Sequence, residues 1–206
     1  MLYLASQSPR RRALLQQLGI DPRMLDVDVP EQQLPDEPAQ DYVSRVAREK
    51  AGAGLLQVMA LADAVVLGAD TEVVLDIDAR AQVLGKPANA DTARTMLRSL
   101  SGRTHAVISA VWVISAAREA HALSISQVTF AALDAALIDN YVACDEWRGK
   151  AGGYAIQGRG AVLIERLTGS YSGVMGLPLF ETARLLREFG VEQGMGNGDL
   201  GMDESQ

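Results

Sequence analysis

The segment Ala64-Val-Val-Leu-Gly-Ala-Asp70-Thr71 is the most core-like stretch of the chain. An unbroken apolar run of this kind is typical of a strand that is buried on both faces of a sheet. The run ends in a carboxylate, Asp70, and the carboxyl ends of such strands are where open α/β sheets bind ligands. An Asp at a strand end can also form a turn or cap a helix. Strand character resumes at once in Glu72-Val-Val-Leu75, which weakens that alternative.

The segment from Tyr3 to Gly19 predicts a short buried strand, a turn and a helix. Ser8 is a suitable N-cap, Pro9 is a suitable first helical residue, and Gly19 ends the helix. Arg10–Arg12 then fill the first turn, at the positive end of the helix dipole, where each charge costs a few tenths to about 1 kcal/mol. A bound polyanion would offset this cost through backbone N–H groups and guanidinium forks. The alternative is that one or more of these arginines face solvent.

Composition limits the classes of protein that this chain can represent. With 206 residues and 48% hydrophobic side chains, it can bury a full core as one domain. The formal net charge of −7 argues against binding of nucleic acid through a general basic surface. The single cysteine, Cys144, excludes an internal disulfide and fits a reducing compartment, and we leave open whether it is catalytic or incidental. No membrane-spanning segment or signal-peptide pattern is apparent, so we expect a cytoplasmic protein without a membrane partner.

Lysine is rare in this chain and therefore informative. Of 19 basic residues only Lys50, Lys86 and Lys150 are lysine, which makes them candidates for site residues, although three cases do not exclude chance. Residues 39–56 have the pattern of an amphipathic helix, and Lys50 falls on the apolar face of this helix with Val43 and Val46. Its ammonium group either reaches the rim of that face or points into a polar cavity.

The remaining pattern alternates between strands and helices, with antiparallel hairpins inserted. This predicts a mixed α/β (α+β) protein with a twisted sheet, in which residues 1–190 form one domain and 191–206 form a disordered acidic tail. The predicted elements are a loop at 21–38, a hairpin around 76–80, a helix from Asn89 to Leu100, strands at 104–115 and 123–130, a helix from Asp134 to Val142, a glycine-rich loop at 149–160, a strand at 161–167 and a helix at 177–189.

Other chemical patterns are weaker. Asp26-Val-Asp28 has the form of a phosphatase nucleophile motif of the haloacid dehalogenases, but the preceding residues make a poor strand. His105 and His121 are too few and too far apart for a histidine metal cluster, and His105 is better explained as structural. Any metal would then be a hard cation held by carboxylates and phosphate oxygens. In the glycine-rich loop, Tyr154 and Gln157 are candidates for stacking on or hydrogen bonding to a base.

Several motifs, taken in order, resemble the Maf family of nucleotide pyrophosphatases, and together they contain all three lysines. They are Leu4-Ala-Ser-Gln-Ser8-Pro-Arg10-Arg11, Ala47-Arg-Glu-Lys50-Ala, Leu67-Gly-Ala-Asp70-Thr71, Gly85-Lys86-Pro87, Leu100-Ser-Gly-Arg-Thr-His105 and Gly149-Lys150-Ala-Gly-Gly-Tyr-Ala-Ile-Gln157-Gly158.

The resemblance implies a fold related to the inosine-triphosphate pyrophosphatases, with a long twisted mixed sheet, two lobes and a central cleft. It implies hydrolysis of a nucleoside triphosphate to the monophosphate and pyrophosphate with a divalent cation, Mg²⁺ or Mn²⁺, by a homodimer with a house-cleaning role. Arg10, Thr71 and Gln157 match the branch that acts on dTTP and UTP. The rival functions are a nucleotide-binding regulator of cell division without turnover, and a pyrophosphatase for purines such as ITP, XTP or 7-methyl-GTP.

The resemblance also implies individual roles. Asp70 would activate water, Glu31 and Asp70 would hold the metal, and four residues would surround the phosphates: Ser8, Arg11, Lys50 and Lys86. One departure from the family pattern is Glu72, which stands where an apolar residue is usual. Glu72 either adds a second carboxylate beside Asp70 or faces solvent.

Overall fold

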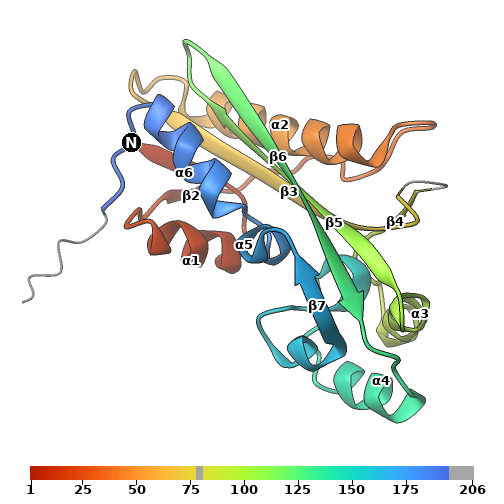
Figure 1. Cartoon of the computed structure of the whole chain (residues 1–206). Coiled ribbons are helices and arrows are strands. Elements are labelled where there is room, and N and C mark those ends of the chain that lie inside the picture. Colours follow the sequence, from red (N-terminus) through yellow and green to blue (C-terminus); the bar gives the residue numbers. More distant parts are fainter. Residues whose placement is uncertain (78–80, 195–206) are drawn as a thin grey trace, which may run out of the picture.

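The computed structural model describes residues 1–77 and 81–194 and contains one mixed sheet with helices on both faces (Figure 1). Its strands are β1 (Leu2–Ala5), β2 (Arg23–Leu25), β3 (Val65–Leu75), β4 (Gln82–Leu84), β5 (Thr104–Ile114), β6 (Glu119–Phe130) and β7 (Ile164–Thr168). Its α-helices are α1 (Pro9–Gln17), α2 (Ala39–Val58), α3 (Ala90–Leu100), α4 (Ala135–Val142), α5 (Tyr171–Met175) and α6 (Leu179–Glu188), and two 3-10 helices are η1 (Ala151–Gly153) and η2 (Arg159–Leu163).

The seven strands follow the order β2-β1-β3-β5-β6-β7, and β4 pairs with β3. β1 is parallel to β2 and to β3, and every other pair is antiparallel. The long strands β5 and β6 link a group of helices that contains α1, α2 and α6 to a second group that contains α3 and α4 (Figure 1). The predicted mixed sheet with two lobes is therefore confirmed.

The sequence suggested that the most core-like strand ends at Asp70, but β3 continues beyond this residue. It continues to Leu75 because its residues pair with β5 on both sides of this position, with Asp70 opposite Ala110. On its other edge, β3 pairs with β1 only at residues 65–67 and with β4 only at residues 73–75. Among the described residues, positions 68–72 therefore have no partner strand on that edge, and Asp70 lies in the middle of this gap.

Two layers of side chains cover the sheet. Even-numbered positions of β3 such as Val74 pack against α2, where Val43, Val46 and Ala47 are fully buried. Odd-numbered positions face the opposite side, where Leu67 and Ala69 pack with α1 and α6. Gly68 lets α2 approach, because a Cβ at this position would lie 2.4 Å from a backbone oxygen of that helix.

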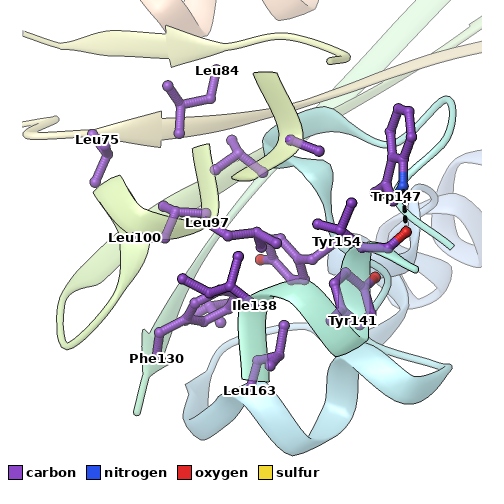
Figure 2. Close-up of a cluster of buried hydrophobic side chains, with 14 of the residues drawn as sticks. Leu75, Leu84, Leu97, Leu100, Phe130, Ile138, Tyr141, Trp147, Tyr154 and Leu163 are labelled. Atoms are coloured by element: carbon purple, nitrogen blue, oxygen red, sulfur yellow. Dashed lines mark hydrogen bonds between the residues drawn. The ribbon is translucent and has the colours of Figure 1, made fainter. Parts of the chain in front are cut away.

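The second lobe has its own apolar core. Leu97, Phe130, Ile138, Trp147 and other side chains from α3, α4 and the adjacent loop gather in one cluster at the far end of β5 and β6 (Figure 2). The indole of Trp147 is buried and donates a hydrogen bond to the carbonyl of Val142. This core anchors the glycine-rich loop that follows Trp147.

Helix starts with side-chain caps were predicted correctly. The Asn89 side chain accepts a hydrogen bond from the amide of Thr92, and Asp134 accepts one from the amide of Leu137. The cap expected at Ser8 is wrong, since its side chain accepts no capping hydrogen bond. Instead its amide donates to the hydroxyl of Ser6 at 3.1 Å.

Several boundaries differ from those predicted. The loop at 21–38 contains the short strand β2, the strand expected at 123 begins at Glu119, and residues 161–163 form a 3-10 turn before β7. The helix expected at 177–189 is present as α6, which begins at Leu179 after Pro178, and the short helix α5 before it was not predicted. The hairpin around 76–80 is present between β3 and β4, although residues 78–80 lie outside the described part of the chain.

The expected tail falls mainly on residues 195–206, which also lie outside the described residues. Within it, Val191 packs against the core beside α6, and Gln193 donates a hydrogen bond to the carbonyl of Ala183. No helix in the described ranges combines the length and apolar character that crossing a membrane requires.

Candidate active site

A cleft of about 460 Å³ opens along the unpaired edge of β3. Its walls come from the β1–α1 turn, α2, β3, the loop after β4, the glycine-rich loop and the end of α5. Lys150 lines it, and so do all nine residues to which the family resemblance assigns a role: Ser8, Arg10, Arg11, Glu31, Lys50, Asp70, Thr71, Lys86 and Gln157. These residues are spread over 150 positions of sequence, and the sheet edge brings them together.

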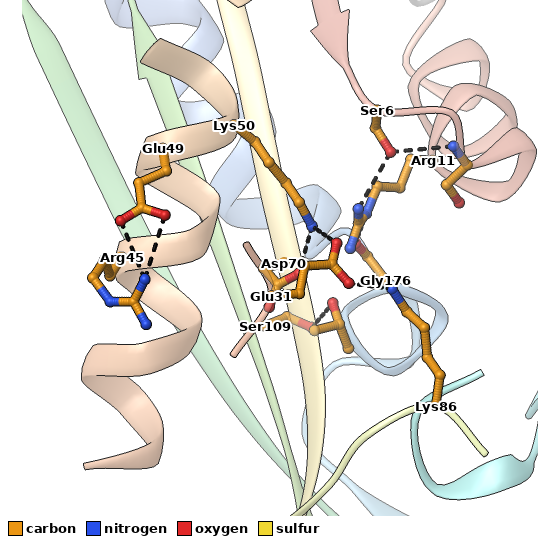
Figure 3. Close-up of polar contacts among 12 residues, drawn as sticks. Ser6, Arg11, Glu31, Arg45, Glu49, Lys50, Asp70, Lys86, Ser109 and Gly176 are labelled. Atoms are coloured by element: carbon orange, nitrogen blue, oxygen red, sulfur yellow. Dashed lines mark hydrogen bonds and ion pairs between the residues drawn. The ribbon is translucent and has the colours of Figure 1, made fainter. Parts of the chain in front are cut away.

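Two ammonium groups and two carboxylates form a connected cluster on the α2 side of the cleft (Figure 3). The Lys50 Nζ donates to Asp70 Oδ1 at 2.8 Å and lies 2.5 Å from Glu31 Oε1. The Lys86 Nζ contacts the second oxygen of Glu31. Of the two possibilities for Lys50, the polar cavity is confirmed, because its side chain is only 9% exposed.

The charges explain the acidity of Glu31. Partial burial raises the pKa of its carboxyl group, but hydrogen bonds from Lys50 and Lys86 outweigh this effect and lower the pKa to about 2. Glu31 is therefore ionised at neutral pH. Although residue 31 comes from an irregular segment, it is held in place by two cations from different elements.

Asp70 has one oxygen without a partner. Its Oδ1 accepts from Lys50, whereas Oδ2 is buried and has no hydrogen-bond partner. A buried acceptor without a partner costs roughly 1–3 kcal/mol, so this atom marks a position where the protein is prepared for a ligand, a water molecule or a cation.

The three consecutive arginines have different environments. The Arg11 Nε donates to the carbonyl of Gly176 at 2.8 Å, and its Nη1 donates to Ser6 at 3.3 Å. Arg10 also lines the cleft, and burial, followed by repulsion from Arg11, lowers the pKa of its guanidinium. Arg12 is exposed and pairs with Asp21. The solvent-facing alternative is thus correct for Arg12 alone.

Glu72 is not a solvent-facing residue. Its side chain is 4% exposed, and its Oε2 is buried without a hydrogen-bond partner. Burial, and then repulsion from Asp70, raise the pKa of this carboxyl group to about 8. Glu72 lies on the same face of β3 as Asp70, since side chains alternate along a strand. The alternative that it adds a second carboxylate to a metal site stays a prediction.

The glycine-rich loop approaches β3 closely. Gly152 has a φ of 66°, and a Cβ at this position would lie 2.9 Å from the side chain of Val73. Its amide donates to the carbonyl of Gly85, which ties the loop to the segment that carries Lys86. Tyr154, a candidate for base stacking, is instead mostly buried in the core, where its hydroxyl lies 2.8 Å from His105 Nε2. The structural interpretation of His105 agrees with this contact.

On the opposite face of β3 from Asp70, Thr71 is held by residues that the sequence did not single out. Its hydroxyl lies 2.8 Å from that of Ser109, which donates in turn to the carbonyl of Gly173. Ser109 was overlooked because a single serine within the apolar strand 106–113 gives no indication of a specific role. The one feature that could have indicated this role is the presence of a hydroxyl group in an otherwise apolar run.

The donor set is compatible with a divalent cation, although no three His, Cys, Asp or Glu side chains in the described ranges are gathered as a ready ligand group. An ammonium group, that of Lys50, bridges Glu31 and Asp70. Carboxylate oxygens that attract one cation in this way, together with the unpartnered Asp70 Oδ2, are the ligand type that Mg²⁺ and Mn²⁺ prefer.

A cleft lined by cations and carboxylates at an open sheet edge defines the class as a protein built to hold a phosphorylated ligand. Comparison with known proteins gives the family: the family described as Maf-like protein matches residues 1–189, and the chain belongs to it. It is 56% identical over 193 residues, 93% of this chain and 100% of the relative, to a protein of Xanthomonas euvesicatoria pv. vesicatoria (strain 85-10) named dTTP/UTP pyrophosphatase. It is 53% identical over 190 residues, 92% of this chain and 98% of the relative, to a protein of Xylella fastidiosa (strain M23) named nucleoside triphosphate pyrophosphatase.

Proposed function

We propose that this protein hydrolyses dTTP, UTP and modified pyrimidine nucleoside triphosphates to the monophosphate and pyrophosphate. The observation that carries this proposal is the unpartnered oxygen of Asp70 in a cleft that also presents Lys50, Lys86, Arg10 and Arg11. A nucleoside triphosphate is the ligand class that needs a carboxylate at the scissile phosphate and several cations around the others. The names of the Xanthomonas and Xylella relatives support the same reaction.

The roles follow from position. Asp70 Oδ2 is free to accept a hydrogen bond from an attacking water, while the Lys50 contact fixes the orientation of the carboxylate. Lys86 and Arg11 would neutralise the charge of the triphosphate, and the side chain of Ser8, which also lines the cleft, would contact its oxygens. Attack on the α-phosphoryl group then releases pyrophosphate, and the cations stabilise this leaving group.

Glu31 and Asp70 would hold the divalent cation. When bound, Mg²⁺ or Mn²⁺ would polarise the α-phosphoryl group and stabilise the pyrophosphate that leaves. Because Lys50 contacts both carboxylates, binding of a metal there requires the ammonium group to share them or to move toward a phosphate oxygen.

The decisive experiment is pyrophosphate release from dTTP, UTP, CTP, GTP, 7-methyl-GTP and ITP, each with Mg²⁺, with Mn²⁺ and with a chelator. Turnover that requires metal and is greatest with dTTP and UTP is the expected result. Release that is greatest with a purine nucleotide would instead favour the purine-specific alternative and contradict the base role of Arg10, Thr71 and Gln157. Binding without any release would favour the cell-division regulator.

The role of Asp70 is tested separately. We expect Asp70→Asn to retain nucleotide binding and to lose at least about a hundredfold in kcat, the scale of a positioned acid–base group. Asp21→Asn is the matched control, because that carboxylate is exposed and lies outside the cleft. Equal turnover in Asp70→Asn and the wild type would refute the role. Homodimer formation and a cytoplasmic location remain part of the proposal, and light scattering tests the former.

A further inference from the structure

The inference concerns how the cleft selects a base, and it rests on the proposed function. Thr71 and Ser109 are cross-strand partners in β3 and β5 and project from the same face of the sheet. Ser109 is 1% exposed, whereas Thr71 is half-buried and lines the cleft. Their hydroxyl oxygens are 2.8 Å apart, so one of the two must donate its hydrogen to the other.

The third member of this chain of hydrogen bonds decides the direction. The Ser109 oxygen lies 2.7 Å from the carbonyl oxygen of Gly173 in α5. A carbonyl can only accept, and a serine hydroxyl has one hydrogen to give. Ser109 therefore donates to Gly173, and the hydrogen between the two hydroxyls must come from Thr71. Thr71 lines the cleft, and its hydroxyl oxygen then has only lone pairs left to offer a ligand.

This arrangement distinguishes pyrimidines by the hydrogen on ring nitrogen N3. Uracil and thymine carry an N3–H donor, whereas cytosine has an unprotonated acceptor at the same position. An oxygen that can act only as an acceptor forms a hydrogen bond with the N3–H group of uracil or thymine. Opposite cytosine, the same oxygen faces the lone pair of N3 and forms no hydrogen bond with it. Gln157 does not impose the same choice, because a terminal amide can present either its oxygen or its NH₂ group.

We propose that Ser109 is a positioning residue for base selection, which holds the Thr71 hydroxyl as a hydrogen-bond acceptor toward the cleft and so favours uracil and thymine over cytosine. Ser109 does not itself contact the base, because it is buried beneath Thr71 and α5. Its influence passes only through the one hydrogen that it accepts from Thr71.

The test compares kcat/KM for UTP with that for CTP in the wild type, Ser109→Ala, Thr71→Val and the double variant. In Ser109→Ala the Thr71 hydroxyl can rotate and donate to cytosine N3, so we expect the UTP-to-CTP ratio to fall about tenfold, as for loss of one directional hydrogen bond. Thr71→Val should lower the ratio too, and adding Ser109→Ala to it should change the ratio no further.

Ser126→Ala is the matched control. Ser126 is equally buried at 1% exposure and also ties the sheet to the chain near α5, through hydrogen bonds with the backbone of Ser170. Among the described residues, no hydrogen bond joins Ser126 to Thr71, so loss of the Ser126 hydroxyl should leave the ratio unchanged even if stability falls. A general loosening of α5 would instead lower the ratio in both serine variants.

An unchanged ratio in Ser109→Ala, an equal change in Ser126→Ala, or a further change on top of Thr71→Val would each overturn this inference alone. A wild type that releases no pyrophosphate from UTP would overturn the proposed function, and the inference with it. The two failures are therefore distinguishable in one set of assays.

Discussion

Substitutions of Lys50 and Asp70, which form a buried ion pair, should have strongly coupled effects on the free energy of unfolding. Their side chains are 9% and 6% exposed, and Nζ and Oδ1 are 2.8 Å apart. At an effective dielectric constant of about 20, two unit charges at this distance attract each other by about 6 kcal/mol. Desolvation offsets most of this attraction in the intact pair, but removal of one partner leaves the other charge buried and alone, which costs about 3–5 kcal/mol.

We therefore expect Lys50→Met to lower the free energy of unfolding by about 3 kcal/mol at neutral pH in the presence of chelator. Asp70→Asn should cost less, since the Lys50 ammonium keeps its contact with Glu31. In the double variant neither charge is stranded next to the other, so the two losses should not add. Urea unfolding of the four proteins gives the coupling free energy directly, and we expect at least about 2 kcal/mol.

An exposed pair of the same length provides the control. Arg48 and Glu119 also lie 2.8 Å apart, but their side chains are 56% and 40% exposed. Solvent screening weakens such pairs, so the corresponding cycle should give a much smaller coupling than that of Lys50 and Asp70. Equal coupling in the two cycles, or a Lys50→Met variant as stable as the wild type, would refute the argument from burial.

Three further predictions follow from single positions. Arg11→Ala should raise KM for UTP by more than about tenfold, because a guanidinium in the cleft contributes a charge-assisted contact to the phosphates. Arg12→Ala should leave KM unchanged, since Arg12 is exposed, and steady-state kinetics of the two variants measure the difference. Gly68→Ala should lose about 1–3 kcal/mol in urea unfolding because its Cβ would overlap the α2 backbone, whereas Gly52→Ala, with nothing within 4 Å, should be neutral or gain up to about 1 kcal/mol. Burial lowers the pKa of His105 to about 4, so the contribution of this neutral imidazole is complete above its unfolded pKa of about 6.5 and is lost as the pH falls toward 4. That loss is about 3 kcal/mol, and His105→Gln should flatten the decrease in unfolding free energy between pH 7 and 4; an equally steep decrease would contradict it.

Features fixed by neighbouring residues could be predicted from the sequence. The helices that begin after Asn89 and Asp134 were placed correctly because each cap is a contact between residues three positions apart. Lys50 was placed correctly because helical spacing alone puts it on the face of Val43 and Val46. In each case the residues that determine the feature lie within one or two helical turns of each other.

Features that depend on distant pairing could not be predicted in the same way. The strand β2 has three residues, and only its parallel contact with β1 defines it. The end of the first apolar run at Asp70 looked like a strand end because a charged residue is rare inside a buried strand. What permits Asp70 there is the cleft at the β3 edge, and that edge is set by how far β1 and β4 extend.

The open edge also explains why one strand can supply residues to two parts of a site. Successive side chains of a strand point to opposite faces of the sheet, so a cleft that lay over one face would reach only every second residue. A cleft at the edge of β3 reaches consecutive residues: Asp70 on the α2 face beside Lys50, and Thr71 on the α5 face beside Ser109. An unpaired edge is ordinarily a liability for aggregation, and here the gap is short and bordered by charged side chains. In the proposed reaction, the same interruption in strand pairing that exposes the edge would let phosphate chemistry and base selection be divided between the two faces of one strand.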